Sequence, residues 1–205
     1  MLNENTLSGI GPGTMLLATT GEIPVEWLAP GDKLITRDHG AQEVLHIVRM
    51  KVLPSGAPPP PPIVFLPGEY GPGGKLTEKL RVAPGTRALV KRPECEAFFG
   101  TDEVLARFSE LSRRGEPRAD PSMGGLSYHI VVMRRHEIIN AGSLWIESMD
   151  AEQARQTELP PAVQRATELF DPAARAPRRC LSAPETALLR GAVPQEVSLL
   201  DLLAA

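Results

Sequence analysis

The fold is decided by the stretch TMLLATTGEIPVEWLAPGDKLITR, residues 14–37, in which short apolar runs alternate with tight-turn residues. We expect strands at Met15–Thr19, Ile23–Val25 and Lys33–Thr36, because each run is bounded by residues that favour turns. A helix is excluded here, since Gly and Pro recur every few residues and would break each helical turn. The stretch therefore predicts an all-β protein.

Composition favours the same class of fold. The 205 residues include 18 glycines and 21 prolines, and aromatic residues make up only 4% of the chain. Such values are typical of many short strands joined by turns. The length suits one core of about 140 to 150 residues followed by a tail.

Charge and hydropathy exclude several function classes. A formal net charge of −3 and a pI near 5.9 give no basic surface for nucleic acid. No apolar run approaches the ~20 residues of a membrane span, and the first residues lack the charged and apolar regions of a cleavable signal. Cys95 and Cys180 form no Cys-x-x-Cys pattern, which favours a reducing compartment. We therefore predict a cytoplasmic protein with no nucleic-acid partner and no membrane association.

Further strands are expected beyond the opening stretch. They fall at Gln42–Val52, at Ile63–Leu66, on both sides of the Pro84–Gly85 turn and at Asp102–Phe108. Between the first two, Pro54–Pro62 favours a stiff polyproline loop over a ligand for SH3-type or WW-type domains, because no flanking Arg sets an orientation.

The composition changes after residue 150. Ala151–Phe170 is rich in helix-forming residues, and the spacing of Ser182 and Glu185 predicts a capped helix that continues to Arg190 and is closed by Gly191. Burying each apolar side chain of this tail is worth roughly 1.5 to 3 kcal/mol. We expect a partner protein or a second copy to cover them, rather than the β domain. They are Leu188, Leu189, Val193, Val197, Leu199, Leu200, Leu202 and Leu203.

The motifs of the opening stretch occur in the order that a known family has them. An opening similar to that of a Hint (Hedgehog/intein) domain, of the bacterial branch often called Hint type 2, is formed by Pro12-Gly13-Thr14, Trp27-Leu28, Pro30-Gly31-Asp32 and Thr36–Gly40. The resemblance implies an all-β horseshoe of short strands that, in active members, cuts or rearranges its own backbone. A short α-helical C-terminal tail follows the horseshoe here.

Later blocks extend this resemblance over most of the chain. The segment Lys79–Val90 is similar to the family's strand that runs into Ser-Pro-x-His-Arg, and Leu126–Ser148 is similar to its closing hairpin. We accordingly divide the chain into a leader of residues 1–8, a Hint-like β domain of residues 9–150 and a helical tail of residues 151–205.

The resemblance also implies which positions would carry self-cleavage. An active member begins with Cys or Ser, whose side chain attacks the preceding carbonyl, and uses a histidine to protonate the leaving amine. In this chain the junction position is Gly9, the serine position of the second block is Ala83 and its histidine position is Thr86. Gly9 has no side chain and Thr86 is no general acid near neutral pH. We therefore expect no catalytic residues and no enzymatic self-cleavage.

Displaced residues offer an alternative route to cleavage. Ser8 or Thr14 could act as nucleophile if the register slipped, although such a slip moves the attacking atom by several ångström. The pair Glu147-Ser148 lies where inteins carry His-Asn, so splicing is not expected. Asn140 is expected to be a turn residue rather than a cyclising one.

Histidine spacing predicts no metal site. His129 and His136 match histidines of the family's closing hairpin, and on paired strands they could face one another, but zinc needs at least three ligands. We expect both to make structural hydrogen bonds and keep them, with Ser8, as weak catalytic candidates. The glycines of Gly9–Gly13 form no phosphate loop, because no strand precedes them and no helix follows. We predict no metal and no cofactor.

Three functions remain open on these grounds. The first is a Hint-type scaffold that has lost self-cleavage and acts as a binding or structural module, and this is the reading that we favour. The second is an autoproteolytic domain with a displaced nucleophile, Ser8 or Thr14. The third is a β domain that binds a small ligand.

Overall fold

The computed structural model describes residues 7–53, 56–71, 74–76, 78–112, 127–149 and 176–203. Strands are the predominant regular element and the helices are few and short, so the predicted all-β class is confirmed. The elements, in chain order, are β1 Met15–Ala18, β2 Gly21–Pro24, η1 Val25–Trp27, β3 Lys33–Thr36, β4 Gly40–Met50, β5 Ile63–Phe65, β6 Tyr70–Gly71, β7 Gly74–Lys75, β8 Leu80–Val82, β9 Arg87–Lys91, α1 Pro93–Phe99, β10 Glu103–Arg107, α2 Phe108–Leu111, β11 Tyr128–Met133, β12 Ile138–Ala141, β13 Leu144–Glu147, β14 Arg179–Cys180, α5 Ala183–Ala192 and α6 Leu199–Leu202.

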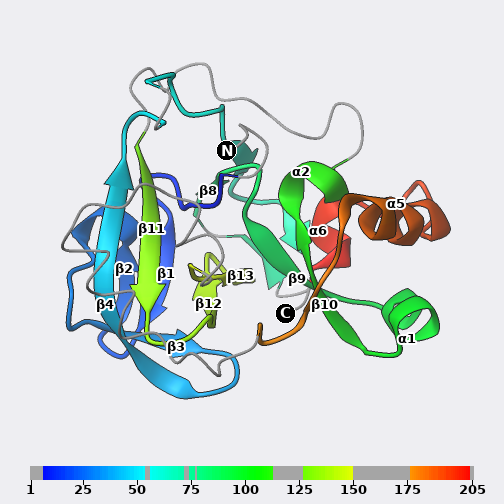
Figure 1. The fold of residues 1–205 in the computed structure, drawn as a ribbon, viewed down its shortest axis with the longest axis horizontal. Helices are drawn as coiled ribbons and strands as arrows, with labels where there is room; N and C mark the ends of the chain where they lie inside the picture. Colours follow the sequence, from blue (N-terminus) through cyan, green and yellow to red (C-terminus); the bar gives the residue numbers. More distant parts are fainter. Residues whose placement is uncertain are drawn as a thin grey trace.

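One long sheet carries most of these strands, in the order β11-β4-β3-β1-β12-β13-β9-β10-β14 with β2 beside β1. Its pairings are antiparallel except for the parallel pair of β10 and β14. Figure 1 shows β11, β4, β1 and β2 on one side of the molecule, and β9 and β10 with the four helices on the other. The sheet therefore curls around the molecule rather than lying flat.

The opening stretch folds almost as its turn residues predict. Strands β1 and β3 form where expected, and Gly31 occupies the left-handed region with a φ of 96° in the turn before β3. The second strand is the exception, because it ends at Pro24 and Val25–Trp27 forms a 3-10 turn. Proline has no N–H to continue the ladder, and the Val25 N–H donates to the Thr14 carbonyl at 2.9 Å.

The segment predicted to be the closing hairpin forms strands that pair with two different parts of the sheet. Strand β11 pairs along the long strand β4, from Tyr128 opposite Met50 to Met133, whereas β12 pairs with β13. The hairpin turn lies at Gly142 and Ser143, both with positive φ. The expectation that Asn140 is a turn residue is therefore wrong, since it lies in β12 opposite Trp145.

The described part of the tail is covered by the β domain, which overturns the reason for expecting a partner there. Leu189, Val193, Leu199, Leu200, Leu202 and Leu203 are all buried in the main core cluster within the chain, whereas Leu188 is 52% exposed. Helix α5 packs against α2 and α1, and Leu203 bridges to Val90 of β9. These side chains are therefore buried against apolar residues of the same chain.

The predicted helix cap of the tail is confirmed, and its predicted end is wrong. The Glu185 carboxylate accepts a hydrogen bond from the Ser182 N–H at 2.8 Å, which forms a capping box at the start of α5. Helix α5 continues through Gly191 to Ala192. A single glycine weakens a helix by about 1 kcal/mol, and burial of Leu189 and Val193 on either side outweighs that cost.

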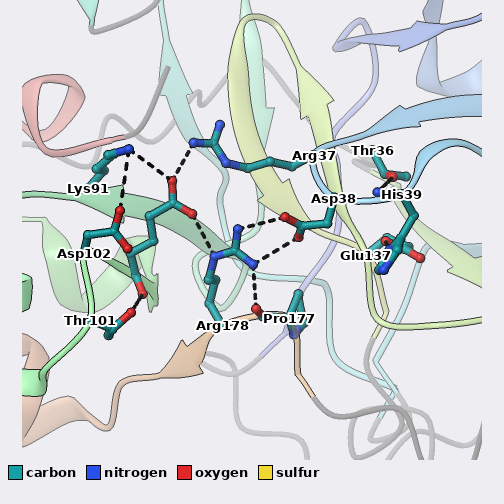
Figure 2. A network of polar contacts seen from close by, with 11 residues as sticks. Thr36, Arg37, Asp38, His39, Lys91, Thr101, Asp102, Glu137, Pro177 and Arg178 are labelled. Atoms are coloured by element: carbon teal, nitrogen blue, oxygen red, sulfur yellow. Dashed lines mark hydrogen bonds and ion pairs between the residues drawn. The ribbon is translucent and has the colours of Figure 1, made fainter.

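A network of hydrogen bonds and ion pairs between charged side chains connects the tail to the sheet, as Figure 2 shows. Arg178 donates to Glu103 of β10 at 2.7 Å and to both carboxylate oxygens of Asp38 at 2.8 and 3.1 Å. Glu103 also accepts from Arg37, whose guanidinium lies 5.4 Å from the centre of the Trp145 ring. Burial alone would raise the pKa of Glu103, but the hydrogen bonds from Arg37 and Arg178 outweigh it and lower that pKa.

One expectation lies outside the described residues, the helix-forming segment Ala151–Phe170. The residues of the proline-rich segment that are described, 56–62, contain neither strand nor helix.

Burial of the tail makes a testable prediction about stability. Leu202→Ala should lower the free energy of unfolding by about 2 to 5 kcal/mol, because Leu202 is fully buried and its removal leaves a cavity. The matched control is Leu188→Ala, which should change it by less than about 0.5 kcal/mol. Urea unfolding curves of both variants measure this, and equal small effects would contradict the packing of the tail.

Candidate functional site

The residues around the predicted junction form a segment in which Ile10 makes isolated β-bridges to Val82 and His129. On one side, the Gly85 N–H donates to the Leu7 carbonyl at 2.9 Å and the Ala83 N–H donates to the Gly9 carbonyl at 2.8 Å. On the other side, Ile10 exchanges two backbone hydrogen bonds of 2.8 Å with His129 of β11. The segment Leu7–Gly11 thus lies between the chain at 81–85 and β11, and joins them into one ladder.

The structure brings Gly9, Ala83 and Thr86 together. The Gly9 N–H donates to the Thr86 hydroxyl at 3.0 Å, and that hydroxyl donates to the Gly9 carbonyl at 3.0 Å. Thr86 is fully buried, so its hydroxyl serves both backbone groups of one residue. The Thr86 side chain thus makes hydrogen bonds to Gly9 of the kind that the backbone of a neighbouring strand would make.

Residue 9 has no room for a side chain. A Cβ placed on Gly9 would lie 2.9 Å from the Cβ of Tyr128, closer than two such atoms pack. Tyr128 cannot readily move, because it is fully buried and its hydroxyl donates to the Pro60 carbonyl at 2.7 Å. Burial also raises the pKa of the Tyr128 phenol, which therefore stays protonated at neutral pH. Sequence reasoning missed this residue, since nothing in a linear motif shows that β11 approaches Gly9.

Gly11 is confined in the same way. Its N–H donates to the Arg81 carbonyl at 2.8 Å, and a Cβ placed on it would lie 2.7 Å from the Arg81 Cβ. The Arg81 guanidinium donates to the Pro12 carbonyl at 2.9 Å. The alternation of glycines at 9 and 11 was the available signal of this close approach, because both face a neighbouring strand.

The two displaced nucleophile candidates are buried. Thr14 is fully buried, and its hydroxyl accepts from the Arg81 N–H at 3.0 Å and donates to the Arg81 carbonyl at 3.2 Å. Ser8 is 8% exposed. Within the part of the chain that the structure describes, the hydroxyl of Thr14 is engaged by the backbone of Arg81 and not by a histidine.

The two histidines do not lie on strands paired with each other. His129 lies in β11 and pairs with Arg49 of β4, whereas His136 precedes β12. Burial lowers the pKa of His129, the nearby charge of Arg49 lowers it further, and its Nδ1 has no partner among the described residues. His136 lies with its Nε2 3.3 Å from the Glu147 carboxylate. Among the described residues, no group of three or more His, Cys, Asp or Glu side chains could hold a metal ion.

A group of buried charged side chains lies at the end of the segment that resembles the family's closing hairpin. The fully buried Glu147 carboxylate accepts from the Arg87 N–H at 3.0 Å and from the Arg87 guanidinium at 2.8 Å, and lies beside His136. Burial alone would raise the pKa of Glu147, but the hydrogen bonds and charges of His136 and Arg87 outweigh it and lower that pKa. The neighbouring Ser148 hydroxyl accepts from the Glu137 N–H at 2.8 Å. Both residues thus connect β13 to its neighbours.

The fold and this arrangement define a class of protein. A curled all-β sheet, with a buried strand at the start that is held between two distant parts of the chain, is the horseshoe architecture that the sequence predicted. The model of the Hint domain (Hint_2) matches residues 9–153, and the chain therefore belongs to the Hint domain family. A search of curated proteins gives no match. Among the described residues, no helix is both long and apolar enough to cross a membrane.

The buried ion group predicts how stability depends on pH. Because the folded pKa of Glu147 is lowered, its contribution is present above its ordinary value of 4.5 and is lost as the pH falls through the folded value. At pH 7, Glu147→Gln should lower the free energy of unfolding by about 3 kcal/mol, since Arg87 loses its buried partner. The difference from the natural chain should shrink below pH 4.5.

Urea unfolding at a series of pH values measures this difference. The control is Glu43→Gln, an exposed site, which should change stability by less than about 0.5 kcal/mol at every pH. A difference for Glu147→Gln that stays constant or grows on acidification would contradict the assignment.

Proposed function

We propose that this Hint domain protein is a scaffold that does not cleave itself and that acts as a binding or structural module. The observation that carries the proposal is the arrangement at Gly9. The residue offers no nucleophile, the Thr86 hydroxyl is bonded to its N–H and carbonyl, and Tyr128 leaves no space for a side chain.

Each step of the family's reaction lacks a group here. Acyl transfer needs a side-chain hydroxyl or thiol on the residue that follows the attacked carbonyl, and glycine has neither. The leaving amine would be the nitrogen of Gly9, and the group that faces it is the Thr86 hydroxyl at 3.0 Å. That hydroxyl accepts the N–H and directs its own proton to the Gly9 carbonyl. A missing general acid alone slows such a step by about 10² to 10⁴-fold.

The alternative nucleophiles receive no support from their surroundings. Thr14 is engaged on both sides by the backbone of Arg81. Attack by Ser8 would need a base to take its proton, and no described histidine is hydrogen-bonded to it. The third reading, a small-ligand site, stays an alternative that the structure does not favour.

Partner and location belong to the same proposal. A protein partner or a second copy would have to use a surface other than the buried leucines of the tail. Cys95 and Cys180 form no disulfide with each other, which supports the proposal of a reducing, cytoplasmic setting.

Intact-mass spectrometry tests whether the chain cuts itself. After several days at neutral pH with added thiol, we expect the full-length mass alone, because Gly9 has no side chain that could attack the carbonyl of Ser8. Fragments that begin at residue 8, 9 or 14 would contradict the proposal.

Two control variants then identify the origin of any fragment. Ser8→Ala and Thr14→Val each remove one displaced nucleophile, and each variant should show only its own full-length mass, as the natural chain does. A fragment that forms in the natural chain and disappears in one of these variants would establish the autoproteolytic alternative with that residue as nucleophile.

A further inference from the structure

The turn between β3 and β4 presents an exposed histidine, His39, on a backbone that hydrogen bonds hold in place. The His39 N–H donates to the Thr36 hydroxyl at 3.2 Å, and the His39 carbonyl accepts from the Gln42 amide at 2.7 Å. The preceding residue, Asp38, accepts two hydrogen bonds from Arg178. The backbone of residue 39 is therefore fixed, and further contacts need only orient the ring.

A buried carboxylate orients that ring (Figure 2). The His39 Nδ1 lies 2.9 Å from a carboxylate oxygen of Glu137, whose side chain is 3% exposed, whereas the side chain of His39 is 43% exposed. The backbone of Glu137 is fixed by Ser148, whose hydroxyl accepts from its N–H and whose N–H donates to its carbonyl, both at 2.8 Å. Burial and these hydrogen bonds hold the carboxylate beside the ring.

This contact decides which ring nitrogen is available for chemistry. A carboxylate only accepts hydrogen bonds, so the Nδ1 of His39 carries the proton, and the lone pair of the neutral ring is at Nε2. Among the described residues, none is hydrogen-bonded to Nε2. A catalytic histidine has the same arrangement, in which a buried carboxylate holds one nitrogen and stabilises the positive charge that forms on the ring.

The other histidines of the chain do not combine these properties. His129 and His136 are 3% and 9% exposed, so their rings are closed to a substrate. His46 is half-buried in β4, and among the described residues no carboxylate is bonded to it. Of the 4 histidines, His39 alone has both an exposed ring and a buried carboxylate partner within the described chain.

The surroundings of the His39 Nε2 limit the class of substrate. No hydroxyl or thiol of the described residues is hydrogen-bonded to it, so the ring itself has to act as the nucleophile. No described group is bonded there that could protonate a leaving group either. The leaving group must therefore depart without a proton, as the phenolate of an aryl ester does.

We propose that His39 is a catalytic residue that hydrolyses small activated acyl esters, with Glu137 as its positioning residue. The Nε2 lone pair attacks the acyl carbon, the bond from that carbon to the phenolate oxygen breaks, and the phenolate leaves with the electron pair. Glu137 keeps the Nδ1 proton of the acyl-imidazolium in its hydrogen bond. Water then attacks the acyl carbon and the bond to Nε2 breaks. The carboxylic acid and a proton are released, and the neutral ring is restored.

Hydrolysis of p-nitrophenyl acetate by the full-length chain tests the proposal, and the release of p-nitrophenolate gives the rate. His39→Gln should lower the second-order rate constant by about 10-fold or more, because glutamine can donate to Glu137 but has no nucleophilic nitrogen. The matched control, His46→Gln, should leave the rate constant unchanged. Equal rate constants for the natural chain and His39→Gln, or an equal loss in His46→Gln, would overturn the proposal.

Variants of Glu137 test the part played by the carboxylate. In a chain that circular dichroism shows to be folded, Glu137→Gln should react as slowly as His39→Gln, and Glu137→Asp, which keeps a carboxylate, should recover part of the rate. A comparison with N-acetylhistidine amide needs no variant of this buried residue, and the natural chain should react about 10-fold faster at equal concentration. A folded Glu137→Gln chain with the natural rate, or a natural chain no faster than the amide, would overturn the proposal.

Discussion

The structure depends on the close backbone approach of the segment Leu7–Gly11 to its two neighbours. Hydrogen bonds on both sides, and glycines where side chains would collide with Tyr128 and Arg81, allow three stretches far apart in the sequence to form one ladder. Without that approach, β8 and β11 would each present an open edge. The same approach leaves residue 9 without a side chain, so the packing of the fold and the absence of a nucleophile have one physical cause.

A second constraint acts near the C-terminal end of the region that matches the Hint domain model. Glu147 is buried with Arg87 and His136, and such a group is stable only while its partners stay in place. The tail is connected to the rest of the chain as well, because Arg178 bonds to Glu103 and Asp38 while Leu189 of α5 and the leucines of α6 are buried in the main core. The described part of the tail is therefore a piece of the same core as the curled sheet.

The sequence predicted the parts of the fold that local turn chemistry determines. Pro30–Asp32 and Pro84–Gly85 punctuate short apolar runs, and the strands beside them form where expected. The resemblance to the Hint family singled out Gly9, Ala83 and Thr86 as residues to compare, and the structure shows the Thr86 hydroxyl bonded to Gly9.

Features that depend on partners distant in sequence could not be predicted in this way. Period-two patterning does not show that β11 pairs with β4 while β12 pairs with β13. The apolar residues of the tail indicate that they must be buried, but they do not show that the β domain of the same chain buries them. The contact between Gly9 and Tyr128 joins residues 119 positions apart, and only the folded chain reveals it.

Hydrogen exchange at the Ile10 and Gly11 amides tests the central claim most directly. The Ile10 N–H bonds to the His129 carbonyl and the Gly11 N–H bonds to the Arg81 carbonyl, so both are inside the ladder. The account predicts that they exchange only when the protein unfolds, with protection within about 10-fold of the Ile130 amide in β11. Exchange within minutes at Ile10 and Gly11, while Ile130 stays protected, would contradict it.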